Sequence, residues 1–522
     1  IRKNTYWKCK VQKFIYRHIP ITYWLLNYSK EDAFCDVVAG VTICLTMVPQ
    51  SIAYASLANL SPEFGLNSAF MGCFIYVFFG TIKEVVIGPS SLMALLTLEF
   101  THDLNADFVI LLCFICGIVE LAMGLLKLGF IVELISSPVV SGFTSATSII
   151  IIFSQIKGLL GVNFKSKGFI DNLMHLIKNI TDIQHADFIL GIGCIILLLI
   201  LRQMKDIPIS GRVPSKQIVK KLLWFLSISR NAMVVVIGSG ISAYYINSGG
   251  KPPFITTNIV QSGLPQIQFP PVSSKLGNTT IDFPIMVQKL GSGIVVIPIV
   301  SILANVAIAK AFKEGPIDAT QEMITLALAN IFGSFVQSMP TSGAFTRSAV
   351  ISASGVRTPL AGLYSASLTL LSLKFLAPYF HLIPRSTLSA ILITAVIFLI
   401  DVKIFFSLWK NSKFDLSCLM CTLLCCVFLG VEIGLLIGIT LSLSRLIYLF
   451  MRPVIKVEKF KKQYGSFIQV TPKIGLFFPT MDILSRLITE VALNEGMGVL
   501  PIVIDCTHFV GLDYTAAKVM YI

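Results

Sequence analysis

The sequence predicts a polytopic α-helical membrane protein, and three observations support this fold class. Of the 522 residues, 55% are hydrophobic and only 13% are charged, against roughly 25% charged residues in a soluble domain. The mean hydropathy of +0.81 excludes a water-soluble enzyme with a polar shell, and also a disordered chain. Apolar runs recur along the chain at lengths close to the roughly 20 residues that a helix needs to cross a bilayer.

The net charge of +14 raises the alternative of a nucleic-acid-binding protein. However, the basic residues gather in the N-terminal head and in the connectors 202–221 and 403–413, without the interleaved aromatic residues of a nucleic-acid patch. Clusters of this kind mark the cytosolic loops of membrane proteins. We therefore expect the lipid bilayer as the partner of this surface, no nucleic acid, and a cytosolic N-terminal region over residues 1–36.

Fourteen apolar elements follow the head. Twelve are candidate transmembrane spans: 37–58, 64–82, 107–128, 136–154, 187–203, 222–246, 285–309, 320–338, 359–379, 384–402, 414–430 and 432–450. Two others, 85–99 and 341–355, are shorter and open with a Gly/Pro/Ser break. These broken segments stand third in two sets of seven, a placement typical of inverted-repeat transporters. The sequence therefore predicts a 7+7 inverted repeat in a transport domain over residues 37–452.

The loops support one orientation of this repeat. With the basic head in the cytosol, the connectors 202–221 and 403–413 also fall inside. Two glycosylation sequons, at Asn179 and Asn278, then fall on the outer face, where such sites are modified. We expect both termini in the cytosol.

Residues 453–522 have a different character. The charged stretch Lys456 to Lys462 is typical of a linker, and it precedes a short strand over 466–470 and an amphipathic helix over 481–494. A buried-strand pattern follows over 498–505, and residues 512–515 indicate a turn into another helix. This order predicts a small α/β domain, which we expect to be incomplete at its C-terminal end.

The two broken segments carry the chemistry. At Gly88-Pro89 and at Pro340, the breaks predict half-helices that start near the middle of the membrane with their N-termini facing each other. Each helix N-terminus offers unpaired N–H groups and about half a positive charge from its dipole. Helix N-termini receive anions in other proteins, and Ser90, Ser91 and Thr346 add hydroxyl donors.

Arg347 strengthens this interpretation. An arginine deep in an apolar segment is rare and usually functional, and no acidic residue stands nearby in the sequence to neutralise it. A substrate anion is therefore favoured as the partner of Arg347. The alternative is an arginine whose side chain reaches an interface or bonds to backbone carbonyls.

On the first span, Gln50 and Tyr54 share one helix face with Met47, where they line either a cavity or a helix contact.

Signals for catalysis are absent from the sequence. The histidines have no cysteine or carboxylate at ligand spacing, and Walker-type glycine loops are missing. We expect a transporter that is not an enzyme and has no metal or cofactor.

Five motifs together resemble the SulP family of sulfate permeases and anion exchangers. They are residues 48–55 (VPQSIAYA), 61–66 (SPEFGL), 88–89 (GP), 318–322 (DATQE) and 345–348 (FTRS). The resemblance covers nearly the whole chain. It implies two inverted repeats split into a moving core and a gate, a cytosolic STAS domain, and a homodimer. By motif, it places Gln50, Tyr54, Ser90, Ser91, Phe345, Thr346 and Arg347 at the anion pocket.

Two departures from the family pattern bear on mechanism. Many relatives have serine where this chain has Ala344, and proton-coupled members have an acid where this chain has Ala304, followed by Asn305. The expected function is therefore sodium-independent, elevator-type transport of sulfate in exchange for chloride, bicarbonate or oxalate, in the plasma membrane or the lysosomal membrane. The alternatives are an uncoupled chloride conductance and a voltage-sensing mechanical or scaffold protein of the same fold.

Overall fold

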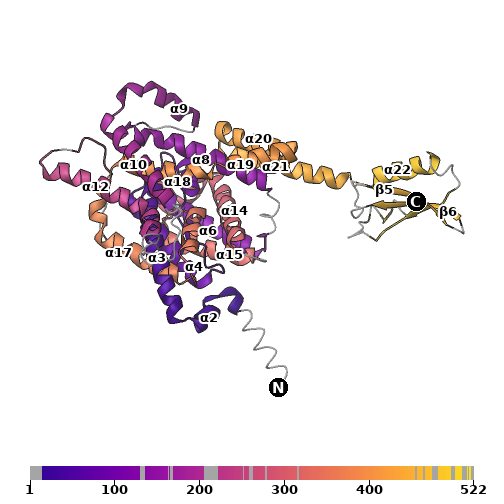
Figure 1. The fold of residues 1–522 in the computed structure, drawn as a ribbon, viewed down its shortest axis with the longest axis horizontal. Helices are drawn as coiled ribbons and strands as arrows, with labels where there is room; N and C mark the ends of the chain where they lie inside the picture. Colours follow the sequence, from indigo (N-terminus) through magenta and orange to yellow (C-terminus); the bar gives the residue numbers. More distant parts are fainter. Residues whose placement is uncertain are drawn as a thin grey trace, which may run out of the picture. The chain divides into compact units, whose positions relative to one another are not determined.

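The computed structural model describes most of the chain and divides it into two compact units, Ile1–Leu435 and Leu436–Ile522. The described residues are 15–129, 136–162, 164, 169–204, 222–250, 252–257, 263–276, 279–313, 317–452, 455–462, 465–472, 480–494, 500–507, 514 and 517–518. The first unit is a bundle of helices (Figure 1).

The elements of the helical unit follow the apolar runs of the sequence. In its first half they are α2 Ile21–Trp24, η1 Leu25–Asn27, α3 Lys30–Leu57, α4 Pro62–Phe79, β1 Ile87–Gly88, α5 Ser91–Phe100, α6 Ala106–Leu125, α8 Ser137–Leu159, α9 Phe169–Lys178, η2 Ile180–Asp182, α10 His185–Gln203 and α12 Arg230–Asn247. The later elements are β2 Ser273–Leu276, β3 Thr279–Asp282, α13 Phe283–Leu290, α14 Gly293–Phe312, α15 Ala319–Phe335, β4 Ser342–Gly343, α16 Phe345–Ala353, α17 Ala361–Phe375, η4 Ala377–Leu382, α18 Arg385–Val396, η5 Ile397–Leu399, α19 Val402–Asn411 and α20 Lys413–Leu429. Helix α21, Val431–Met451, leads into the second unit.

By length and composition, the unit has the helices of a membrane protein. Six helices in the described ranges are long and apolar enough to cross a membrane, and up to eight if two bent pairs each form one span. The bent pairs are Leu222–Ile228 with α12, at 67°, and α13 with Gly293–Ala309, at 59°. Helices α15, α17 and α20 have only 15 to 17 residues. The fourteen-segment arrangement stays a prediction.

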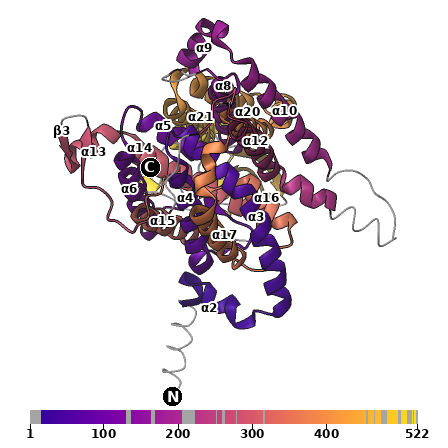
Figure 2. The same cartoon turned by 90° about the vertical axis from the view of Figure 1, so that its left-hand side faces the viewer.

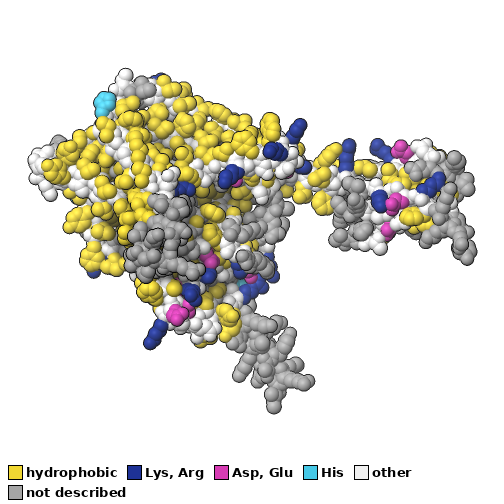
Figure 3. Space-filling model, viewed as in Figure 1, with side chains coloured by type: hydrophobic (Ala, Val, Ile, Leu, Met, Phe, Trp, Pro, Cys, Tyr) yellow, Lys and Arg dark blue, Asp and Glu magenta, His cyan; other side chains and the backbone are white. Residues whose placement is uncertain are grey.

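The surface of the helical unit is apolar over a broad area. Hydrophobic side chains cover much of the face seen in Figure 3, and charged side chains gather toward its lower edge. Large exposed hydrophobic residues include Phe188, Ile189, Ile196 and Val236. Water does not favour so much exposed apolar area, whereas hydrocarbon tolerates it, so this surface suits a bilayer.

Helix α3 is the longest of the described helices, and local signals set its start. The Ser29 side chain accepts from the Asp32 amide, and Asp32 accepts from the Ser29 amide, which forms a reciprocal capping box. Pro49 lies inside the helix, where it removes one backbone hydrogen bond. The adjacent residues 50–55 are all buried, so this weakened stretch of α3 faces the interior.

The two short segments meet through backbone pairing. Strands β1 and β4 pair antiparallel, with Ile87 opposite Gly343 and Gly88 opposite Ser342. Helices α5 and α16 follow directly, with ten and nine residues. Segments that are about 250 residues apart in sequence thus begin their helices side by side.

The second unit contains β5 Ile455–Lys462, β6 Gly465–Pro472, α22 Met481–Asn494 and β7 Ile502–Ile504. The sheet order is β5-β6-β7, with β5 antiparallel and β7 parallel to β6. The strand predicted over 466–470 lies within β6, and the predicted helix coincides with α22. Most of the turn predicted at 512–515 lies outside the described residues, as do 498 and 499 of the last predicted strand.

The linker predicted over Lys456 to Lys462 is wrong, because these residues form strand β5. Its alternate positions Ile455 and Val457 pack on the small core of this unit, while Lys456 and Glu458 form an ion pair of 2.7 Å. The lysines of this stretch make the alternation of apolar residues difficult to recognise in the sequence. Charged residues on an edge strand hinder pairing with other chains, so lysine-rich composition is compatible with a strand here.

The structure describes the acceptor asparagine of only the first of the two sequons. Asn179, the acceptor of the first sequon, directly follows α9, and its side-chain amide donates to the His175 carbonyl at 2.9 Å. In both ribbon views α9 and α2 lie at opposite ends of the helical unit (Figures 1 and 2). The acceptor of the second sequon, Asn278, lies outside the described residues.

Close contact between α3 and α4 gives a first testable prediction. A Cβ built on Gly65 would lie 2.1 Å from the Ser51 carbonyl oxygen, so Gly65→Ala forces the two helices apart. Overpacking of this kind costs about 1–3 kcal/mol of unfolding free energy. We expect a lower melting temperature in detergent, measured by the loss of the monodisperse chromatographic peak on heating.

Gly193→Ala is the matched control, because Gly193 is also helical and nothing lies within 4 Å of its added Cβ. Alanine favours a helix over glycine, so this variant should melt at the wild-type temperature or slightly above it. Equal melting of the two variants would contradict the contact between α3 and α4.

Candidate anion-binding site

The paired strands place two helix N-termini next to each other. Ser90 is the N-cap of α5, where its Oγ accepts from the Met93 amide at 3.4 Å. The same Oγ lies 2.8 Å from the Ser342 Oγ of the second segment. Because each N-terminus carries unpaired N–H groups and a partial positive charge, the pair forms a local positive field.

A cavity of about 330 Å³ opens at these N-termini. It is lined by residues of α3, α5, α8, α14, β4, α16, α18, η5 and α21. Six of the eight residues predicted for the site are in this lining: Tyr54, Ser90, Ser91, Ala344, Phe345 and Thr346. The structure therefore brings together residues from three distant parts of the sequence.

Gln50 and Arg347 are the two predicted residues that do not line the cavity. Both are buried, with 5% and 1% of their surface exposed. The Gln50 Oε1 has no hydrogen-bond partner among the described residues, and neither does any of the three guanidinium nitrogens of Arg347. Both side chains are therefore buried outside the lining, and each has buried polar atoms without a partner among the described residues.

Arg347 lies against the β1–β4 pair. A Cβ built on Gly88 would lie 3.2 Å from its Nη1, so the glycine leaves the space that the guanidinium uses. A buried charge without a partner costs several kcal/mol, so this guanidinium is electrostatically unsatisfied among the described residues.

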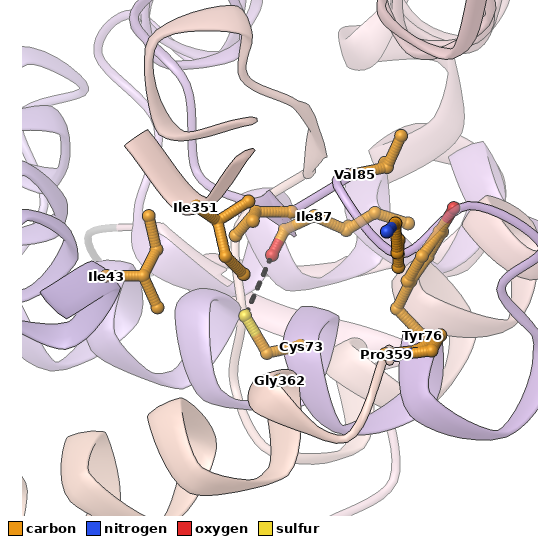
Figure 4. Close-up of a pocket in the computed structure, with 10 residues that line it drawn as sticks. Ile43, Cys73, Tyr76, Val85, Ile87, Ile351, Pro359 and Gly362 are labelled. Atoms are coloured by element: carbon orange, nitrogen blue, oxygen red, sulfur yellow. Dashed lines mark hydrogen bonds between the residues drawn. The ribbon is translucent and has the colours of Figure 1, made fainter. Parts of the chain in front are cut away.

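The back of β1 is filled tightly. Cys73 donates through its thiol to the Ile87 carbonyl at 3.5 Å, as the close-up in Figure 4 shows. The void beside it, lined by Ile43, Val85 and Ile351 among others, is only about 10 Å³, about enough for a single water. The open side of the paired N-termini is therefore the larger cavity.

A buried carboxylate braces the strand β4 from one side. Glu120 on α6 is fully buried, and its Oε2 accepts from the Asn330 side chain on α15 at 2.8 Å. The Asn330 Oδ1 in turn accepts from the Thr341 amide at 2.9 Å and from the Thr341 hydroxyl at 2.8 Å. Thr341 directly precedes β4, so these bonds fix where the second half-helix starts.

A second buried carboxylate, Glu322 on α15, lies near β4. Glu322 accepts from the Tyr76 hydroxyl at 3.1 Å, the Thr81 amide at 3.2 Å and the Asn305 side chain at 3.3 Å. The Asn305 Oδ1 is 2.8 Å from the position of a Cβ on Gly343. Asn305 thus bonds to Glu322 and packs against β4, where a side chain at Gly343 would displace it.

Sequence reasoning missed both braces. Glu120 and Asn330 are separated by 210 residues, and neither stands in a pattern that singles it out. Glu322 is in the DATQE motif, but its contact with Asn305 depends on the packing of α15 against α14. In the sequence, Asn305 is only the residue after Ala304, which stands where proton-coupled members have an acid. The structure shows that a buried acid bonds to it from the neighbouring helix.

Taken together, these features define a membrane transporter for small anions, because hydrophobic helices surround a cavity whose inner end is positively polarised. The chain belongs to the sulfate permease family, whose sequence model matches residues 34–422. The matched relatives are named as transporters and permeases, so the chain is a transporter rather than an enzyme.

Relatives from animals, plants and fungi match. The chain is 38% identical to the sodium-independent sulfate anion transporter of Bos taurus over 97% of this chain and 84% of that protein. It is 34% identical to sulfate transporter 4.1, chloroplastic, of Arabidopsis thaliana, over 86% of this chain. It spans 64% of that protein and 50% of sulfate permease 2 of Saccharomyces cerevisiae. The sequence runs 307–312 (AIAKAF) and 504–508 (IDCTH) predict the likeness to the animal transporter, which is confirmed.

Solved structures share the fold. SLC26A9 matches with a TM-score of 0.83 at 19% identity, over 98% of this chain and 86% of that one. The transmembrane domain of the cyanobacterial bicarbonate transporter BicA matches with a TM-score of 0.62 at 19% identity, over 80% of this chain and 98% of that one. At these identities, the likeness concerns the fold alone.

The brace at Asn330 gives a second prediction. Asn330→Ala removes the amide donor of the Glu120 carboxylate, which keeps the weak bond from the Cys116 thiol at 3.4 Å, and leaves the Thr341 amide without its partner. Unsatisfied buried groups cost about 1–3 kcal/mol each. We expect the unfolding free energy to fall by about 2–4 kcal/mol, measured as a lower melting temperature in detergent.

Thr341→Val serves as the graded control. It removes only the hydroxyl donor and keeps the backbone bond to Asn330, so the loss should be nearer about 1 kcal/mol. Equal losses in the two variants would mean that Asn330 does not connect Glu120 to β4.

Proposed function

We propose that this chain carries sulfate and chloride-type anions across the membrane, with the anion held between the N-termini of α5 and α16. The observation that carries the proposal is the buried guanidinium of Arg347, which has no hydrogen-bond partner among the described residues and lies against the paired strands. Three sources of positive potential then converge on one cavity: two helix dipoles and one fixed charge.

The residues have distinct roles in this proposal. Ser91 and Thr346, whose hydroxyls make no hydrogen bond within the described part of the chain, donate to the anion. Ser90 caps α5 and bonds to Ser342, so it orients the N-terminus. Phe345 and Tyr54 form part of the cavity wall, and Ala344 contributes only its backbone. Gln50 and Arg347 act from outside the lining.

The names of the relatives support sulfate as the substrate. The bovine protein is a sodium-independent sulfate anion transporter, and the plant and yeast proteins are a sulfate transporter and a sulfate permease. We extend this to sodium-independent exchange of sulfate for chloride, bicarbonate or oxalate. Elevator-type movement is the proposed mechanism: α5 and α16, joined by β1 and β4, move as one body with the anion.

The wider organisation is also part of the proposal. It comprises fourteen segments as a 7+7 inverted repeat over residues 37–452, a STAS domain over 453–522, and a homodimer. Asn179 and Asn278 are the proposed glycosylation sites, and both termini are cytosolic in the plasma or lysosomal membrane. The three-stranded sheet with α22 supports an α/β tail domain.

The site is tested with the purified Arg347→Gln variant reconstituted into proteoliposomes. Truncating one partner of a buried charge pair costs about 2–5 kcal/mol, so sulfate affinity should weaken at least about 30-fold, measured as the concentration dependence of radiolabelled sulfate uptake. Lys374→Gln removes one positive charge at the exposed end of α17 and should leave uptake unchanged. Wild-type affinity in properly folded Arg347→Gln would sink the assigned site.

Exchange is tested separately by the contents of the vesicle. With membrane voltage clamped by an ionophore, sulfate uptake should require chloride, bicarbonate or oxalate inside, because exchange couples the two movements. Uptake that voltage alone drives, without any internal counter-anion, would rule out exchange and indicate a conductive path.

A further inference from the structure

The cavity has far more room than an inorganic anion needs. Its volume of about 330 Å³ is at the lower end of the range of about 300–1,000 Å³ that holds drug-sized molecules. A water takes about 30 Å³ of liquid volume, and sulfate is a single sulfur with four oxygens. Most of the cavity therefore stays empty or filled with water when sulfate occupies the helix N-termini.

The donors of the two helix N-termini lie together at one end of the cavity. The hydroxyls of Ser91 and Thr346 have no partner among the described residues, and the first-turn N–H groups of α5 and α16 are beside them. An anionic group placed here meets the donors of both helix N-termini. The charged end of any ligand is therefore fixed at the paired N-termini.

The α8 wall offers no donors in spite of its hydroxyl groups. Thr144 donates to the Ser141 carbonyl at 3.1 Å, Thr147 to the Phe143 carbonyl at 3.1 Å, and Ser148 to the Thr144 carbonyl at 2.7 Å. Each hydroxyl hydrogen is thus used within the helix. An anion gains nothing from contact with this wall.

The remaining lining is mostly aliphatic, with Tyr54, Phe143 and Phe345 as its aromatic members. Its aliphatic part includes Val300, Leu303, Ala307 and Ile308 from α14, Ala395, Val396 and Leu399 from α18 and η5, and Leu435 from α21. Val300 and Val396 are each 1% exposed. Apolar surface of this kind favours an apolar group over water, so the cavity has a polar end and an apolar body.

We propose that the cavity binds organic anions with one sulfonate or sulfate ester group on a short alkyl or aryl body. The sulfonate oxygens occupy the donors at α5 and α16, and the apolar body displaces water from the walls of α14 and α18. This inference rests on the proposed anion site, because it uses the same polar end, and it adds a class of ligand to that site.

A homologous series tests the proposal. Methane-, ethane-, propane- and butanesulfonate compete with radiolabelled sulfate for uptake into proteoliposomes of the wild-type protein. Each methylene buried against the wall should lower the inhibition constant about fourfold, until the cavity is full, and the inhibition should be competitive with sulfate. Alcohols of the same chain lengths should not compete, because they lack the anionic group.

Two variants test whether the alkyl chain of the sulfonate contacts the aliphatic wall of the cavity. Val396→Thr keeps the side-chain volume and puts a hydroxyl in the aliphatic wall, so the gain per methylene should shrink. Val295→Thr makes the same substitution on α14 at a position that is 55% exposed and outside the cavity lining, and it should keep the full gain.

The outcomes separate this inference from the proposed function. Sulfate uptake with inhibition constants that are flat along the series overturns the organic-anion proposal and leaves sulfate transport standing. Inhibition that does not compete with sulfate overturns it too, because the alkyl chains then act from elsewhere. Absence of sulfate uptake in the wild-type protein overturns the proposed function itself.

Discussion

The buried charge of Arg347 is the constraint on which the rest of the site depends. An uncompensated guanidinium in a hydrophobic bundle is unfavourable by several kcal/mol, so the fold must supply both the space and the stability that keep it there. Gly88 supplies the space. The stability comes from the helices around it, whose buried contacts and polar bonds hold the paired strands in place.

The two carboxylate braces explain how a pair of two-residue strands persists. Strands this short are not stable alone, and β1 and β4 together have only four residues. Glu120 holds the start of β4 through Asn330, and Asn305, which donates to Glu322, packs against its end at Gly343. The bonds that these acids accept come from neighbouring amides, hydroxyls and the Cys116 thiol, and none comes from the guanidinium of Arg347. Direct pairing therefore does not cancel the positive field at the helix N-termini.

The sequence predicted the half-helices because Gly, Pro and Ser are local signals that act over a few residues. Six of the eight site residues line one cavity because those signals mark helix N-termini, and N-termini are where donors are free. The braces were not predictable, because they depend on which helices are neighbours. Strand β5 was mistaken for a linker because lysines outnumber the residues that alternate into the core. Gln50 and Arg347 are buried and lie outside the cavity lining, so their contact with the anion stays a prediction.

The α8 wall also has a kinetic consequence. The hydroxyls of this wall are bonded within their own helix, so in the proposed mode of binding the anion has polar contacts at the paired N-termini and none with α8. Release then requires breaking the contacts at α5 and α16 and no others, so the same bonds set both the affinity and the rate of departure. Among anions of similar size, those held more tightly would leave more slowly, and throughput would be greatest for ions of intermediate affinity.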